Sequence, residues 1–245
     1  AGTMGRHYAQ REGLLSEVCE AIFEAALPRQ AGDLLPRTPA GLLAAMADRL
    51  DSLVGLFAAG CNPSASADPY GLRRAAYGML QALVSTGTPL SLRVAVAAAV
   101  ALQPVAVSAQ QQTAVVDYLT GRLEQLITDQ GVMPEIVRAV LLERGDNPAL
   151  AMATAEQLRA AWEAGEGAPL QAVLAAFSRP TRIVRGKAVD AAWVVDPALF
   201  ELQEERQLHE AVCAVRSHMA PSSASVAEFL EALAPLSAPI DAYFE

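Results

Sequence analysis

The sequence predicts an all-α protein. Of its 245 residues 53% are hydrophobic and only 5% are aromatic, with alanine dominant among the apolar residues, which favours closely packed helices. Apolar residues recur at the three- and four-residue spacing of helices, and the alternation typical of half-buried strands is almost absent. A chain of this length can form two ordinary domains with cores of their own, so we expect two helical domains.

A helical hairpin over residues 38–84 organises the first part of the chain. Thr38 can cap the first helix, and Pro39 can occupy its first turn, where the missing N–H costs nothing. The expected inner face is an apolar stripe at helical spacing: Leu42, Leu43, Met46, Leu50, Leu53, Val54 and Phe57. The opposite face, which we expect to be solvated, carries polar residues: Asp48, Arg49, Asp51 and Ser52.

The second helix of the hairpin is expected to start at Asp68 and Pro69, again as cap and first turn. Its outer face begins with Arg73 and Arg74. Before the hairpin, the sequence predicts a helix over residues 16–27 with Ser16 as its cap.

The rest of the chain is predicted to be a series of helices separated by glycine and proline. The charged turn at residues 143–148 is the predicted domain boundary. Ser225 and Glu228 form a capping-box pattern. Between residue 90 and the boundary, helices are expected at about 90–102, 110–129 and 134–144. Beyond the boundary they are expected at about 148–163, 168–178, 196–219 and 226–234, with a further start at 239.

Charge is distributed unevenly along the chain. The formal net charge of -9 at pH 7 argues against nucleic-acid binding through a global field. Within residues 179–187, however, four cations occur without an acid: Arg179, Arg182, Arg185 and Lys187. Such a basic strip suits phosphate groups, with ordinary solvated surface as the alternative.

Cysteine usage and hydropathy limit the cellular setting. The three cysteines are far apart in the chain: Cys19, Cys61 and Cys213. Their number and spacing fit neither a disulfide framework nor a zinc site, which indicates a reducing compartment. The most apolar run, residues 94–102, is far shorter than the ~20 residues of a membrane helix, so we predict a buried helix there and no membrane partner.

No motif for catalysis is present. The sequence lacks a glycine-rich phosphate loop, a nucleophile elbow and paired metal-binding motifs. The three histidines are interpreted as surface residues: His7, His209 and His218. Asp48 and Asp51 lie three residues apart and are interpreted as part of the solvent-exposed face of a helix, with a metal site or an ion pair as alternatives. We therefore expect no catalytic residue and no metal site in this chain.

Six segments spread over nearly the whole chain carry a family resemblance: GRHYAQREG, GDLLPRTPAG, ADRLDSLVGLFAAGCNPS, DPYGLRRAAYGM, SRPTRIVRGK and PIDAYFE. Their order and spacing resemble the beta-type region of bacterial glycyl-tRNA synthetase. AAGCNPS and SRPTRIVRGK are similar to the plastid-type enzyme of plants and green algae, in which alpha- and beta-type regions are fused in one polypeptide.

The resemblance implies a helical HD-like domain over residues 1–146 and an anticodon-binding domain over residues 147–245, similar to the DALR type of arginyl-tRNA synthetase. The first domain is expected to be truncated at its N-terminus and the second at its C-terminus. The family attaches glycine to tRNA with ATP and magnesium, but its adenylate-forming site lies in the alpha-type region. Nothing in this chain resembles that region, so the active site and the cofactors are expected elsewhere in the full enzyme.

The resemblance also implies partners and a location. The expected partners are tRNA-Gly and the alpha-type catalytic region, in the same chain or as a separate subunit, within a homodimer or an alpha2beta2 assembly. The expected location is the chloroplast stroma or the mitochondrion, with a bacterial cytoplasm as the alternative. The candidate tRNA contacts are the basic strip and the start of the second hairpin helix: Arg179, Arg182, Arg185, Lys187, Arg73 and Arg74.

Two other functions stay open at this level. The ADRLDS stretch resembles the last aspartate motif of HD phosphohydrolases, which would make Asp48 a metal ligand. The chain lacks the His-Asp doublet that such a site needs. A non-catalytic helical interaction scaffold is the second alternative, favoured by the acidity and the alanine-rich helices.

Overall fold

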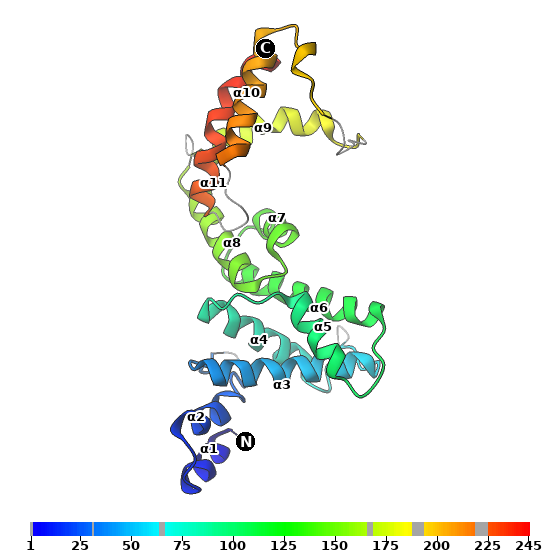
Figure 1. Ribbon diagram of the computed structural model, residues 1–245. Coiled ribbons are helices and arrows are strands. Elements are labelled where there is room, and N and C mark those ends of the chain that lie inside the picture. The colour runs from blue at the N-terminus through cyan, green and yellow to red at the C-terminus, as the bar shows by residue number, and fades with distance from the viewer. Residues whose placement is uncertain (1, 31, 64–66, 166–168, 188–193, 219–224) are drawn as a thin grey trace. The chain divides into compact units, whose positions relative to one another are not determined.

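A computed structural model describes residues 2–30, 32–63, 67–165, 169–187, 194–218 and 225–245 (Figure 1). Within these ranges the chain forms α-helices and two short 3-10 helices and no strand. The all-α prediction is therefore confirmed.

The structure divides into two compact units, residues 1–155 and residues 156–245. The division falls inside helix α8 (Pro148–Glu163), later than the boundary expected after residue 146. Asp146 belongs to the first unit, where its carboxylate accepts hydrogen bonds from the Ser91 hydroxyl (2.6 Å) and the Arg93 N–H (2.9 Å). The assignment of the two regions as HD-like and anticodon-binding domains stays a prediction.

The first unit is built around three long helices. Its helices are α1 (Gly2–Arg11), α2 (Ser16–Glu24), α3 (Pro39–Ala58), α4 (Leu72–Thr86), α5 (Leu92–Leu102), α6 (Ala109–Asp129), α7 (Pro134–Arg144) and the first part of α8. α3 packs against α2, α4, α5 and α6, and α4 packs against α6. The core between them is aliphatic and includes Leu53, Val54, Leu80, Leu83, Leu119 and Leu123.

The predicted start of the hairpin is confirmed. The Thr38 hydroxyl accepts a hydrogen bond from the Gly41 N–H (3.0 Å), and Pro39 is the first residue of α3. At the other end of the connection α4 begins at Leu72, later than predicted, because Gly71 adopts a left-handed conformation with φ of 68°. From outside the helix, the Asp68 carboxylate still accepts hydrogen bonds from the first two N–H groups of α4, those of Leu72 and Arg73.

Arg49 is buried, which corrects the prediction of a solvated position. Only 7% of the residue is exposed. Its guanidinium donates hydrogen bonds to four backbone carbonyl oxygens: those of Ala25 (3.1 Å), Leu27 (2.7 Å), Pro28 (3.2 Å) and Ala45 (2.9 Å). The side chain thus fixes the segment after α2 against α3.

Glu24 is a second buried charged residue, at the end of α2. Its carboxylate accepts hydrogen bonds from the N–H groups of Arg37 (3.0 Å) and Thr38 (3.0 Å) and from the Thr38 hydroxyl (2.5 Å). Burial acts to raise the pKa of Glu24, but these hydrogen bonds and the positive charge of Arg37 outweigh it, and the pKa lies below its ordinary value of 4.5.

The lowered pKa of Glu24 predicts a loss of stability in acid. Because the ionised form is favoured in the folded state, its stabilisation is complete above pH 4.5 and disappears as the pH falls through the lower folded pKa. Urea unfolding of the wild type and of Glu24→Gln across this range should show a steeper acid loss in the wild type. The variant should also be less stable at neutral pH, by about 1–3 kcal/mol. Parallel pH profiles for the two proteins would contradict this assignment.

The most apolar segment forms α5, but the helix is not buried as predicted. Leu92 and Val96 face the core, whereas Val94 and Leu102 are 69% and 82% exposed. Among the described helices, none has the combination of length and hydropathy required to cross a membrane.

The second unit packs its helices around two small apolar clusters. Besides the end of α8 it contains α9 (Pro169–Val184), η1 (Pro197–Leu199), α10 (Gln203–His218), α11 (Val226–Leu233), η2 (Ala234–Leu236) and α12 (Ser237–Phe244). One cluster is formed by Leu170, Val173, Val226 and Leu230. The other is formed by Ala176, Val215, Leu236 and Ile240.

In the second unit α9 and α10 differ from their predicted extents, α12 begins at Ser237 instead of 239, and the predicted cap of α11 is confirmed. α9 continues through Pro180 to Val184 instead of ending at residue 178. The helix expected over 196–219 is interrupted after η1, where the Glu205 carboxylate accepts hydrogen bonds from the N–H groups of Glu201 and Leu202, the two residues that precede α10. The capping box of Ser225 and Glu228 is present at α11.

Candidate nucleic-acid interface

The basic strip lies at the C-terminal end of α9. Arg179 and Arg182 belong to the helix, and Arg185 and Lys187 follow it directly. All four residues are exposed. In the part of the chain that the structure describes, none of the four pairs with a carboxylate. The strip therefore leaves positive charge open to solvent on an acidic protein.

The four cations of the strip are not equally available. Arg179 donates a hydrogen bond to the carbonyl oxygen of Phe244 in α12 (2.6 Å), and its guanidinium lies 5.0 Å from the centre of the Phe244 ring. Arg182 contacts its own helix through a long Nε hydrogen bond to the Ser178 carbonyl (3.3 Å). Arg182, Arg185 and Lys187 thus have more freedom to meet a ligand than Arg179.

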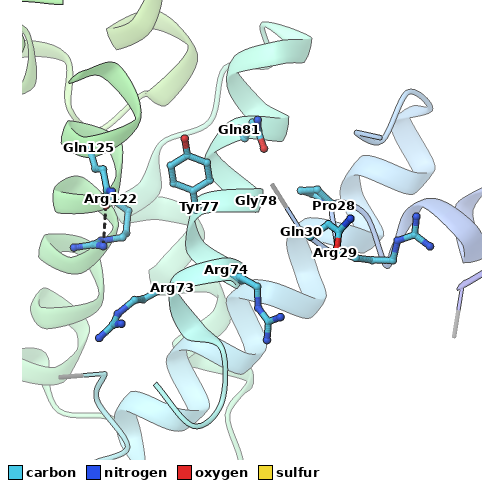
Figure 2. A pocket seen from close by; sticks show the side chains of 10 residues that line it. All are labelled: Pro28, Arg29, Gln30, Arg73, Arg74, Tyr77, Gly78, Gln81, Arg122 and Gln125. Atoms are coloured by element: carbon cyan, nitrogen blue, oxygen red, sulfur yellow. Dashed lines mark hydrogen bonds between the residues drawn. The ribbon is translucent and has the colours of Figure 1, made fainter. Parts of the chain in front are cut away.

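The other two predicted contacts lie in a groove of the first unit (Figure 2). Residues of α4 form its floor, the segment after α2 forms one wall, and α6 forms the other. The cavity measures about 260 Å³. We name it the α4 groove, and its lining residues are Pro28, Arg29, Gln30, Arg73, Arg74, Tyr77, Gly78, Gln81, Arg122 and Gln125.

Local sequence explains the shape of the groove. Gly78 allows the segment after α2 to approach α4 closely, because a Cβ at this position would lie 2.8 Å from Cγ of Pro28. Arg49 holds the carbonyl groups of Leu27 and Pro28 from the other side. The wall that carries Arg29 is therefore fixed by a glycine on α4 and a buried arginine on α3.

The arginines of the α4 groove have different partners. Arg29 makes a two-pronged ion pair with Asp33 (2.7 and 3.0 Å), which holds the pKa of Asp33 well below its usual range. Arg122 donates to the Gln125 side-chain oxygen (3.0 Å) and lies 5.5 Å from the centre of the Tyr118 ring. The Nε of Arg122 is buried and has no hydrogen-bond partner.

One further polar group of the floor, the Tyr77 hydroxyl, donates a hydrogen bond to the Asp129 carboxylate (3.3 Å). Burial and the charge of Asp129 raise the pKa of Tyr77. No carboxylate lines the groove among the residues that the structure describes.

Sequence analysis identified Arg73 and Arg74 as candidates but missed Arg29 and Arg122. Arg122 is the single cation of α6, and Arg29 lies in the segment after α2; both are far from α4 in the sequence, and no motif marks them. Only the packing of α4 beside α6 brings Arg122 to the groove. No local sequence pattern could have revealed that Arg122 lies beside α4.

The residues considered for metal binding do not gather into a site. Among the described residues, no group of three or more histidine, cysteine or acidic side chains is arranged to hold a metal ion. Asp51 accepts a hydrogen bond from the Gln103 side chain (2.8 Å). His209 lies 3.5 Å from the sulfur of Cys213 on α10, and the three cysteines are free.

Comparisons with known proteins find relatives named as glycine–tRNA ligases over the whole chain. The family model described as glycyl-tRNA synthetase beta subunit matches residues 1–142. The chloroplastic/mitochondrial glycine–tRNA ligase 2 of Arabidopsis thaliana is 42% identical over 244 residues, which is 100% of this chain and 22% of the relative. The glycine–tRNA ligase beta subunit of Chromohalobacter salexigens is 36% identical over 247 residues, 100% of this chain and 36% of the relative.

A third relative, the glycine–tRNA ligase beta subunit of Haemophilus influenzae strain PittGG, is also 36% identical, over 100% of this chain and 35% of its own length. The chain therefore spans between about a fifth and about a third of the length of these relatives. The phosphohydrolase and scaffold alternatives find no support in these similarities.

Proposed function

The chain belongs to the glycyl-tRNA synthetase beta subunit family, and from this premise we propose that it is a tRNA-recognition region of a glycine–tRNA ligase. The observation that carries the proposal is the basic strip. Its four cations are exposed, and none is paired with a carboxylate in the described part of a chain with a net charge of -9. Unpaired surface cations on an acidic protein favour a local phosphate contact.

The chemistry available to this region is binding. Arginine forks can donate two parallel hydrogen bonds to a phosphate, and their planar faces can stack on an unpaired base. Arg182 and Arg185 would contact the anticodon part of tRNA-Gly, with Lys187 as a further point charge, and Arg73 and Arg74 would contact the tRNA body. The region would supply position and affinity for a reaction performed elsewhere in the enzyme.

The remaining expectations follow from the same premise. The full enzyme would bind ATP and magnesium in an alpha-type catalytic region, which is fused to this region or carried by a separate subunit of a homodimer or an alpha2beta2 assembly. The match to a chloroplastic/mitochondrial relative supports a plastid or mitochondrial location, with a bacterial cytoplasm as the alternative.

Charge reversal of the basic strip tests this proposal. Arg182→Glu/Arg185→Glu should weaken binding of a tRNA-Gly transcript by at least tenfold in fluorescence anisotropy. It should also reduce the slope of log K against log salt by about 1.5, because each lost phosphate contact contributes about 0.7–0.9. The loss arises since two attractive charges become repulsive.

The matched control is Arg206→Glu/Arg216→Glu on α10, which changes the net charge by the same amount at two exposed positions. It should bind the transcript within about threefold of the wild type, the residual effect being screened long-range charge. Equal weakening by the two double variants would show that only net charge matters and would remove the basic strip from the interface.

A further inference from the structure

We propose that the α4 groove is a second RNA contact, which binds the sugar–phosphate backbone without reading the bases. The inference rests on the proposed function, because it takes tRNA as the ligand. It goes further by assigning a defined site to the first unit and by adding Arg122 to the contacting residues.

The first argument is the concentration of positive charge. Four arginines and no carboxylate line a groove of about 260 Å³, although acidic residues outnumber basic ones in the chain as a whole. Asp33 neutralises Arg29. Arg74 and Arg122 have no carboxylate partner in the part of the chain that the structure describes. An anion in the groove would therefore be attracted by a positive potential that no carboxylate of the lining neutralises.

The second argument is that Arg122 is held in place. Its guanidinium lies over the Tyr118 ring and is tied to Gln125, while its buried Nε has no partner. A side chain that is already ordered loses less entropy on binding, so the part of the Arg122 guanidinium that lines the groove is prepared to meet a phosphate oxygen.

The third argument is the size of the groove. Its volume of about 260 Å³ lies below the roughly 300–1,000 Å³ of pockets that enclose whole small molecules. It has room for one phosphate and its sugar within a chain that continues outside. The polar groups that line the groove also suit a backbone contact. The Tyr77 hydroxyl already hydrogen-bonds to Asp129, so it is not free to read a base. The glutamine amides can both donate to and accept from a ribose hydroxyl.

The test uses the full chain and two charge reversals, Arg74→Glu and Arg122→Glu. Each should weaken binding of a tRNA-Gly transcript about tenfold and reduce the slope of log K against log salt by about 1. The same loss is expected with an unrelated tRNA, since a backbone contact weakens binding uniformly across sequences. A loss confined to tRNA-Gly would overturn the assignment of a contact that does not read bases.

The control for charge is Arg138→Glu on α7, in the same unit. Its side chain is 67% exposed, forms an ion pair with Glu135 on its own helix and donates a hydrogen bond to the Pro134 carbonyl. If the groove variants bind tRNA no more weakly than Arg138→Glu, the groove is not an RNA contact. Arg122→Met keeps the packing on Tyr118 and should still lose affinity, which separates a lost contact from a damaged fold. Full affinity in Arg122→Met would contradict the role of Arg122.

Two further measurements separate this inference from its alternatives. ATP and inorganic phosphate are titrated against the wild type and Arg74→Glu. Micromolar ATP binding that Arg74→Glu abolishes would reassign the groove to free nucleotides. If the wild type binds no tRNA, the proposed function itself fails. If the wild type binds and only Arg182→Glu/Arg185→Glu weakens binding, the proposed function stands and the groove assignment fails.

Discussion

Replacing Arg49 by methionine is expected to lower the free energy of unfolding of the first unit by about 3–5 kcal/mol. The guanidinium is buried and donates to four backbone carbonyl oxygens. Three of these carbonyls, those of Ala25, Leu27 and Pro28, lie beyond the end of α2. Methionine fills a similar volume but leaves these acceptors buried and unpaired, which costs more than the lost hydrogen bonds alone.

The partners of Arg49 explain why a buried charge is tolerated. Burial lowers the pKa of its guanidinium, and the charge of Asp48 partly offsets this. No carboxylate hydrogen-bonds to Arg49 among the described residues. The oxygen atoms of the four carbonyl groups therefore stabilise its positive charge in place of a counter-ion. Arginine suits this task because its fork can serve several acceptors at once.

Urea unfolding followed by circular dichroism measures the effect. Arg49→Lys keeps the charge but cannot reach all four acceptors, so its stability should fall between those of the wild type and Arg49→Met. Arg93→Met is the control, because this side chain is 78% exposed and should change stability by less than about 0.5 kcal/mol. An Arg49→Met protein as stable as the Arg93→Met control would rule out the structural role.

Features that depend on neighbouring residues could be predicted from the sequence. The Thr38–Pro39 start of α3 and the Ser225–Glu228 box of α11 formed as expected, because a cap needs only residues within one turn of the helix end. The all-α class followed in the same way from apolar spacing along each helix.

Features that depend on residues distant in the sequence could not be predicted from it. Arg49 lies on the polar side of a helical pattern, but three of its four acceptors come from a segment 21 to 24 residues earlier in the chain. Nothing in the local pattern indicates that these carbonyls need a donor. The extension of α9 past Pro180 is similar, since Arg179 on this turn contacts Phe244 of α12, 65 residues later.

The candidate site likewise has one part that the sequence predicts and one part that it does not. Charge counting found the basic strip because its four cations are close in sequence. It found only half of the arginines of the α4 groove, because Arg29 and Arg122 enter from elements that meet α4 only after folding. A contact assembled from single residues of several elements requires the structure to be recognised.

The second large effect is expected at Gly41, where alanine should destabilise the first unit by about 2–3 kcal/mol. Alanine normally stabilises a helix relative to glycine by about 1 kcal/mol, so the predicted sign is reversed. A Cβ at position 41 would lie 2.5 Å from Cβ and 3.0 Å from Cδ of Glu24. Glu24 cannot simply move away, because its carboxylate holds the start of α3 through three hydrogen bonds.

Gly121→Ala provides the matched control for Gly41→Ala. Gly121 lies inside α6, and a Cβ there would meet nothing within 4 Å, so this substitution should raise the free energy of unfolding by about 0.5–1 kcal/mol. A double-mutant cycle with Glu24→Ala identifies the cause, because alanine at position 41 should cost much less once the Glu24 side chain is removed. If Gly41→Ala and Gly121→Ala stabilise equally, the close approach of α2 to α3 at Glu24 is looser than the distances indicate. Opposite signs, with the cost at Gly41 relieved by Glu24→Ala, would establish that glycine is needed at this position to admit the carboxylate that anchors α3.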